Sequence, residues 1–391
     1  MEDKSAGVGV EREDGWGAPV LSFLILGLVV GIPYYALPFF YDYMERAHLW
    51  ERSAVMLGLP LGTLATLVVG PWLARVPDLR RAVAAGGLLC GVAVAGLGWT
   101  GDSILRYYGC WIVYMVGWTM AGPLAQQMVL GGWRRGKSGP ALALAYSGIS
   151  LFGAMSVAVV ARPLTAWLGW QGALGGMGVV VSLAGVLAWA LPQGERAEER
   201  EGGRLQWNRA FWLLLVGSTL FGLAVGGVAQ HLKLILAERG AMEQMELDAL
   251  LGWCVMAMLT AGVVGRFFFG WAGNRMRKEW LVVGAAALMC VALQWLMSGD
   301  VRASALGFSP LFGFGLSADF LTVPLLAIER FRSKKALGVM VPVNTLGQTW
   351  FPYVLALVWS ATGGYEAPVW LTQGLLAVGA GCVWAMGRER A

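Results

Sequence analysis

Long apolar runs of about 20 residues dominate this 391-residue sequence, and that is the length a helix needs to cross a bilayer. Backbone polar groups find no partner in lipid, so such spans are helical. We place spans near residues 18–40, 53–74, 82–100, 105–130, 140–161, 171–191, 210–229, 249–270, 280–298, 303–328, 336–358 and 367–386. The sequence therefore predicts an all-α polytopic membrane protein with 12 transmembrane helices.

Composition supports this fold class and excludes several functions. Hydrophobic residues make up 57% of the chain and charged residues 14%, whereas soluble domains carry roughly 25% charged residues. The five cysteines are scattered through apolar runs without a CxxC pair, so we interpret them as packing residues. The sequence has no HExxH, Walker or nucleophile-elbow motif. We expect no enzyme activity, no cofactor, no metal and no nucleic-acid partner.

Basic residues indicate the orientation. The loops after even-numbered spans, together with both tails, carry most of the Lys and Arg residues. The opposite side carries only Arg46, Arg52, Arg106, Arg162, Lys233, Arg239 and Arg302. The positive-inside rule then places both termini in the cytoplasm. We expect a multi-pass protein of the inner (plasma) membrane, with the lipid bilayer as its surroundings.

Two short segments recur at nearly the same offset, which indicates a duplicated architecture. The segment 70–75, with Arg75 at its end, recurs as 270–275, and the segment 133–135 recurs as 331–333. A charged stretch at 193–209 divides the chain. We predict two pseudo-symmetric six-helix halves, 1–192 and 210–391, joined by a cytoplasmic linker at 193–209, with a binding site between the halves near the bilayer midplane.

These segments resemble a known family. The 70–75 and 270–275 segments are similar to the Gly-x-x-x-Asp-Arg signature of the major facilitator superfamily, with Ala74 and Asn274 in place of the aspartate. The segment from Trp133 to Gly148 resembles the aromatic, basic-pair, Ala-rich pattern of its monocarboxylate and oxalate–formate porter branch. Asp14-Gly-Trp-Gly17 resembles that branch's other marker. The resemblance covers essentially the whole chain and implies this fold and a bacterial-type porter.

Arg266 and Asp319 are charges within predicted spans, whereas every other charged residue falls in a loop, in a tail or close to a span end. An intramembrane charge is costly and by default functional. Arg266 lies eight residues before Asn274, about 12 Å along the helix. In the monocarboxylate branch, an arginine four residues before a glycine anchors the substrate carboxylate, and Arg266 with Gly270 matches that position. A guanidinium can pair with a carboxylate through two hydrogen bonds.

Asp319 lies ten residues before Glu329, about 15 Å into its helix and at a depth similar to that of Arg266. Bacterial members of the branch often carry an acid in a glycine-rich stretch that resembles 313–319. Animal members carry their proton-site aspartate where this chain has Gly262, and a lysine where it has Tyr34. The resemblance therefore implies proton transfer by Asp319 and a monoanionic substrate. The alternative is that Arg266 and Asp319 form a fixed structural pair.

Other polar residues complete the predicted cavity. Tyr34 and Tyr35 lie between Pro33 and Pro38, where a broken helix would expose their hydroxyls, although aromatic residues are also common at membrane interfaces. Asn344 and Gln348 share one face of a span and would contact either the substrate or a neighbouring helix. Gln126 and Gln127 pose the same choice. We expect His231 to be an interfacial histidine.

The resulting functional hypothesis is a secondary active transporter of a small organic monocarboxylate, working by alternating access as a proton-coupled monomer. Arg266, Tyr34, Tyr35, Asn344 and Gln348 would bind the substrate, and Asp319 would carry the proton. Two alternatives remain: an exporter of larger amphipathic compounds, which the 17 methionines leave open, and a non-transporting membrane sensor of a ligand.

Overall fold

The computed structural model describes residues 16–73, 75–131, 138–192, 207–240, 242–273, 275–331 and 334–388. Several features predicted from the sequence lie outside these ranges. They are most of the linker, Ala74, Asn274, the basic pair after Trp133 and the start of the marker at Asp14. The described residues form helices and turns, with no strand among them.

The first span is assembled from short helical pieces. These are α1 (Gly17–Leu26), the π-helical η1 (Gly27–Gly31), α2 (Ile32–Ala36), the 3₁₀-helical η2 (Leu37–Phe40) and α3 (Tyr41–His48). Pro33 and Pro38 lie at the starts of α2 and η2. Proline has no backbone N–H to donate, so the helical ladder changes type at both residues. Tyr34 and Tyr35 follow the first of these breaks.

The remaining helices of residues 1–192 complete five further crossings. They are α4 (Arg52–Met56), α5 (Gly58–Leu64), α6 (Thr66–Leu73), α7 (Leu79–Leu97), α8 (Ile104–Ala121), α9 (Pro123–Gly131), α10 (Ser138–Met155), the π-helical η3 (Ser156–Ala161) and α11 (Arg162–Ala188). Within α11 the chain turns at Gly169, whose φ is 71°, a value that favours glycine. That turn separates the fifth crossing from the sixth.

Residues 207–388 form longer, less broken helices. They are α12 (Arg209–Arg239), α13 (Gln244–Ala272), α14 (Lys278–Leu296), α15 (Val301–Phe331), α16 (Lys334–Thr362) and α17 (Glu366–Arg388). Eight stretches of the described residues are long and apolar enough to cross a membrane. The predicted all-α polytopic fold class is confirmed. The seventh predicted span is wrong at its end, because α12 continues ten residues beyond 229 to Arg239.

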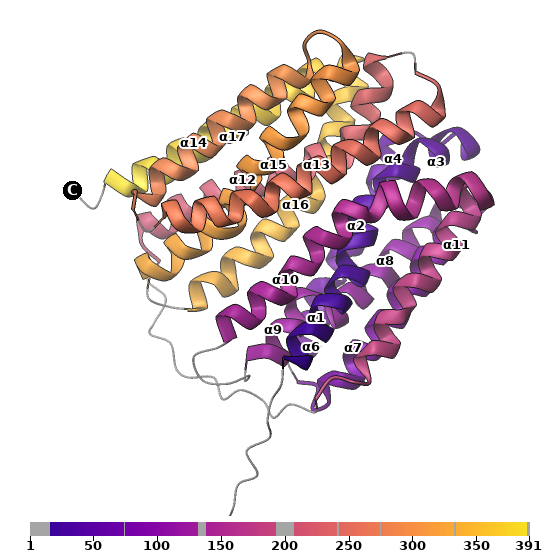
Figure 1. Ribbon diagram of the computed structural model, residues 1–391, viewed down its shortest axis with the longest axis horizontal. Coiled ribbons are helices and arrows are strands. Elements are labelled where there is room, and N and C mark those ends of the chain that lie inside the picture. Colours follow the sequence, from indigo (N-terminus) through magenta and orange to yellow (C-terminus); the bar gives the residue numbers. More distant parts are fainter. Residues whose placement is uncertain are drawn as a thin grey trace, which may run out of the picture.

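Figure 1 shows two groups of helices, α1–α11 in indigo to magenta and α12–α17 in salmon to yellow. Each group packs chiefly on itself, as α7 does on α8 and α11, and α12 on α15, α16 and α17. The groups meet where α10 and η3 pack on α13, α4 and α5 on α16, and η2 on α12. We call the end of the bundle at which α3 meets α4 and α12 meets α13 the α3–α4 end.

Glycines let α13 and α15 approach closely near the predicted anchor. A side chain at Gly313 would overlap the carbonyl of Met258, and one at Gly265 would meet Ser317 Oγ at 2.7 Å. Ser317 Oγ also donates a hydrogen bond to the Gly262 carbonyl at 2.6 Å. Small residues at helix crossings are the usual means of close packing in membranes. Here they fix α15 against the turn of α13 that precedes Arg266.

Candidate functional site

Arg266 lies on α13, partly buried, where the two groups of helices meet. Its guanidinium is within electrostatic range of the Tyr35 hydroxyl. A side chain at Gly153 would meet the Tyr35 ring at 2.6 Å and Leu259 at 2.8 Å, so α10, Tyr35 and α13 come together at this glycine. The structure thus brings together two of the predicted site residues, one from each half of the chain.

Asp319 lies on α15, but its side chain is outside the described residues. Its backbone position is two residues after Ser317, which bonds to Gly262 on α13. The two predicted charges are therefore on adjacent, closely packed helices. Their direct pairing stays a prediction.

Tyr34 presents a buried hydroxyl to the same interface. The side chains of Gln230 and Gln348 lie within interaction range of it, yet it makes no hydrogen bond of normal geometry with the described residues. Its ring meets that of Tyr35 edge-on, with centroids 5.1 Å apart. A buried hydroxyl that makes no such bond is energetically costly, which sets Tyr34 apart from the other polar groups at this interface.

Gln230 is a residue that the sequence reasoning missed. It is buried on α12, accepts a hydrogen bond from the Tyr41 hydroxyl at 2.8 Å, and donates to the Tyr34 carbonyl at 3.4 Å. Gln230 lies nine residues before the end of α12 and just outside the predicted span 210–229, so the sequence did not mark it as a polar residue inside a span.

Asn344 and Gln348 lie on α16 and face α12. The Asn344 Oδ1 atom accepts hydrogen bonds from Thr219 at 2.7 Å and Ser218 at 3.3 Å. These bonds tie the two helices together, which is the helix-contact alternative for the amide oxygen. A side chain at Gly226 would overlap the Gln348 backbone, so the helices touch one turn further along. A substrate role for Asn344 and Gln348 stays a prediction.

Gln126 and Gln127 are committed to protein contacts. Gln126 is fully buried, accepts from Ser22 at 2.7 Å and donates to the Ala121 carbonyl at 3.0 Å. Gln127 donates to the Tyr146 hydroxyl at 2.7 Å. Both the oxygen and the nitrogen of the Gln126 amide thus bond to other helical residues, as the helix-contact alternative predicts.

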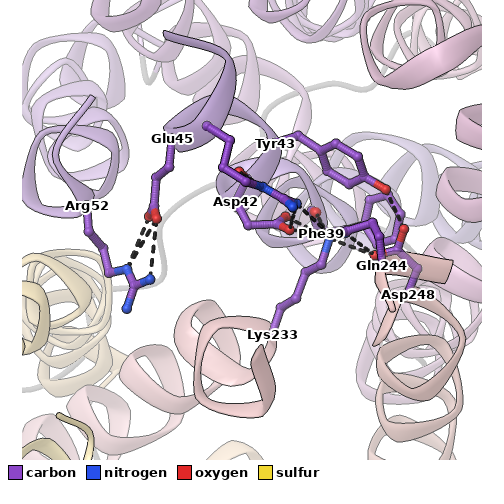
Figure 2. A network of polar contacts seen from close by, with 9 residues as sticks. Phe39, Asp42, Tyr43, Glu45, Arg52, Lys233, Gln244 and Asp248 are labelled. Atoms are coloured by element: carbon purple, nitrogen blue, oxygen red, sulfur yellow. Dashed lines mark hydrogen bonds and ion pairs between the residues drawn. The ribbon is translucent and has the colours of Figure 1, made fainter. Parts of the chain in front are cut away.

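Lys233 is the principal site residue that the sequence placed wrongly. It was counted among charges close to a span end, but α12 carries it inside the bundle, where its side chain is fully buried. Its Nζ atom lies 2.7 Å from Asp42 Oδ1, 2.8 Å from Asp248 Oδ1 and 2.6 Å from the Phe39 carbonyl (Figure 2). The contact with Asp42 is an ion pair without hydrogen-bond geometry.

Further contacts surround this ammonium at the α3–α4 end. It lies 4.1 and 4.4 Å from the ring centroids of Phe39 and Tyr43, within the range of a cation–π attraction. The Tyr43 hydroxyl donates to Asp248. The Gln244 amide donates to Asp248 at 3.0 Å and to Asp42 Oδ2 at 3.1 Å. Among the described residues, two carboxylates, one backbone carbonyl and two aromatic rings therefore stabilise the positive charge of Lys233.

A second cluster closes the same end beside α16. Arg52 pairs with Glu45 at 3.2 Å and lies 4.0 Å from the Trp359 ring centroid (Figure 2 shows the Glu45 pair). His231, expected near the membrane interface, is fully buried within the helical bundle. Its Nε2 lies 2.8 Å from the Pro352 carbonyl, which can only accept, so Nε2 carries the proton. Nδ1 then accepts from the Tyr365 hydroxyl at 2.6 Å.

This arrangement defines a class of protein: a multi-pass membrane transporter with two helical groups, polar residues between them, and one end held closed by ion pairs.

In the described ranges, no group of three or more His, Cys, Asp or Glu residues is placed to hold a metal.

The chain belongs to the Major Facilitator Superfamily, whose family profile matches residues 130–352. No curated protein matches the chain.

Solved structures share the fold at low sequence identity. A bacterial homologue of the human lysosomal transporter Spinster, inward-facing and occupied, is 13% identical with a TM-score of 0.76, covering 95% of this chain and 96% of its own. Its inward-facing, unoccupied form is 12% identical with a TM-score of 0.72, covering 95% and 94%. The nucleoside transporter NupG, in a substituted form, is 12% identical with a TM-score of 0.74, covering 95% and 98%. The monocarboxylate branch remains a prediction.

Proposed function

We propose that this protein is a secondary active transporter of a small organic monocarboxylate that works by alternating access. The observation that carries the proposal is Arg266, a partly buried guanidinium on α13 that lies within electrostatic range of Tyr35 on the opposite half. A cation that lies between the two halves of a transporter can bind an anionic substrate and contact both halves at the same time.

The neighbouring groups suit a monoanion. The guanidinium offers two parallel N–H donors to one carboxylate, and the Tyr35 hydroxyl is placed near the same charge. The buried Tyr34 hydroxyl, with Gln230 and Gln348 beside it, offers neutral polar contacts to the rest of the substrate. Asp319, on the helix packed against α13, is proposed as the proton carrier.

The topology proposed from the sequence sets the direction of closure. With both termini cytoplasmic, the α3–α4 end faces outward and the contacts of Lys233 and Arg52 seal the outer side. The hydrogen bonds and ion pairs that join the halves gather there. This supports an inward-facing state. We propose in addition that the porter is a monomer of the inner membrane, with 1–192 and 210–391 as its moving halves.

The proposal is tested by uptake of labelled carboxylates into proteoliposomes, with and without a pH gradient. Arg266→Gln should abolish uptake of the transported acid, and Arg266→Lys should retain only part of it because lysine lacks the planar fork. Arg302→Gln is a matched control, because Arg302 is exposed and pairs with Glu246 on its own half. Undiminished uptake by Arg266→Gln would refute the anchor role.

Asp319→Asn separates coupling from binding. We expect this variant to exchange substrate across the membrane while losing the dependence of uptake on the pH gradient. Uptake that still follows the gradient would remove Asp319 from the proton path and leave the role of Arg266 intact.

A further inference from the structure

Lys233 and the three charges around it are divided equally between the two halves of the chain. Asp42 and Arg46 both lie on α3 and pair at 2.6 Å. Lys233 and Asp248 lie on α12 and α13 and pair at 2.8 Å. Each half therefore holds one neutral ion pair of its own.

The contacts across the halves form a separate set. They are the ion pair of Lys233 with Asp42, the bond from Lys233 to the Phe39 carbonyl, and the bonds of Tyr43 with Asp248 and of Gln244 with Asp42. Arg46 also donates to Gln244. If the halves separate at the α3–α4 end, these bonds break while both internal pairs survive.

We propose that Asp42, Arg46, Lys233 and Asp248 form an ion-pair gate that divides into two neutral pairs when the α3–α4 end opens. A buried charge left alone is strongly unfavourable. Because each half keeps its own counter-ion, opening exposes no unpaired buried charge, and the gate can open and close in each transport cycle. This inference rests on the alternating-access part of the proposed function.

The division gives the two carboxylates opposite roles, although they lie at nearly equal distances from one ammonium. Asp42 attracts Lys233 across the halves, so that attraction exists only in the closed state. Asp248 attracts Lys233 within one half, so that attraction is present in both states and cancels.

Neutralising either carboxylate therefore shifts the gate in a different direction. Asp42→Asn removes cross-half attraction and should favour the open end. Asp248→Asn leaves Lys233 uncompensated on its own half, with Asp42 across the gap as its ionic partner, and should favour the closed end. Both variants remove the repulsion between the two carboxylates, which acts only when the halves are together. In Asp42→Asn the lost attraction is larger than this gain, because Lys233 Nζ contacts Asp42 directly at 2.7 Å.

The experiment measures the distance across the gate by pulsed electron spin resonance. Spin labels go on Glu51→Cys and Met245→Cys, two exposed positions at the α3–α4 end, one on each half. The full-length protein is reconstituted in lipid nanodiscs, with its five native cysteines replaced. The ratio of long-distance to short-distance populations reports the open and closed gate.

We expect Asp42→Asn to raise the open-to-closed ratio and Asp248→Asn to lower it, each by about tenfold or more, since close interfacial charge pairs commonly contribute that much. Tyr43→Phe, which removes one cross-half bond, should shift the ratio in the same direction as Asp42→Asn. It tests the opening direction if Asp42→Asn does not fold. Glu246→Gln is the matched control, because its pair with Arg302 lies within one half and should leave the ratio unchanged.

Shifts in the same direction for Asp42→Asn and Asp248→Asn, or no shift for Asp42→Asn and Tyr43→Phe, would overturn the gate. Uptake measured on the same variants separates the two proposals. Opposite shifts in a protein that transports no carboxylate would support the gate and refute the substrate. Carboxylate uptake by a protein in which both variants shift the ratio in the same direction would support the substrate and refute the gate.

Discussion

Replacing Lys233 with methionine should destabilise this protein far more than removing a surface charge. Methionine retains a flexible apolar stem of similar length, so the main change is the loss of the ammonium. That loss leaves the carboxylates of Asp42 and Asp248 facing each other with side-chain exposures of only 10% and 7%. The cation–π contacts with Phe39 and Tyr43 are lost as well.

The magnitude follows from the burial. Removing one partner of a buried ion pair costs about 3–5 kcal/mol, because the charge that remains is desolvated and has lost its counter-ion. Here that charge is Asp248, since Asp42 keeps its ion pair with Arg46. At about 2–4 °C per kcal/mol for units of 150–250 residues, the unfolding midpoint should fall by about 6–20 °C. The midpoint is measured by thermal unfolding of the purified protein in one detergent at constant pH.

Two further variants show whether charge is the cause. Arg302→Met breaks an ion pair whose partners are 60% and 50% exposed, so it should cost less than about 1 kcal/mol. The triple variant Lys233→Met, Asp42→Asn, Asp248→Asn removes all three buried charges and should recover most of the lost stability. If the unfolding midpoint of Lys233→Met lies within about 2–3 °C of that of the unmodified protein, the expected cost of leaving a buried carboxylate without its counter-ion is refuted.

Three other substitutions test separate parts of the structure. Gly313→Ala places a methyl group against the backbone of α13 and should lower the unfolding midpoint, whereas Gly284→Ala, which has open space around it, should not. Tyr34→Phe removes a hydroxyl without a hydrogen bond among the described residues. It should leave the midpoint unchanged and weaken substrate affinity about twofold to tenfold in uptake assays. Arg52→Lys loses a planar contact with Trp359 and should cost about 0.5–2 kcal/mol in the same thermal assay.

The sequence alone determined the all-helical membrane fold and the position of several helices along the chain. The predicted span 280–298 corresponds to α14 at Lys278–Leu296, and 367–386 to α17 at Glu366–Arg388. Membrane crossing is a local requirement: a fixed thickness of hydrocarbon demands a fixed length of apolar helix, and that length can be counted along the chain. Arg266 and Asp319 could be recognised from the sequence for the same reason, because each is a charged residue inside an apolar segment long enough to cross the membrane.

Only the tertiary structure revealed what surrounds Lys233. The apolar count ended the seventh span at 229 and placed Lys233 among the charges close to a span end. In the folded chain α12 continues because Asp42 and Asp248 supply counter-charges inside the bundle. Tyr43 and Asp248, which bond directly, are 205 positions apart in the sequence. Partners so distant leave no periodic pattern, so the cost of a buried charge can be judged only when the helices that neutralise it are in place.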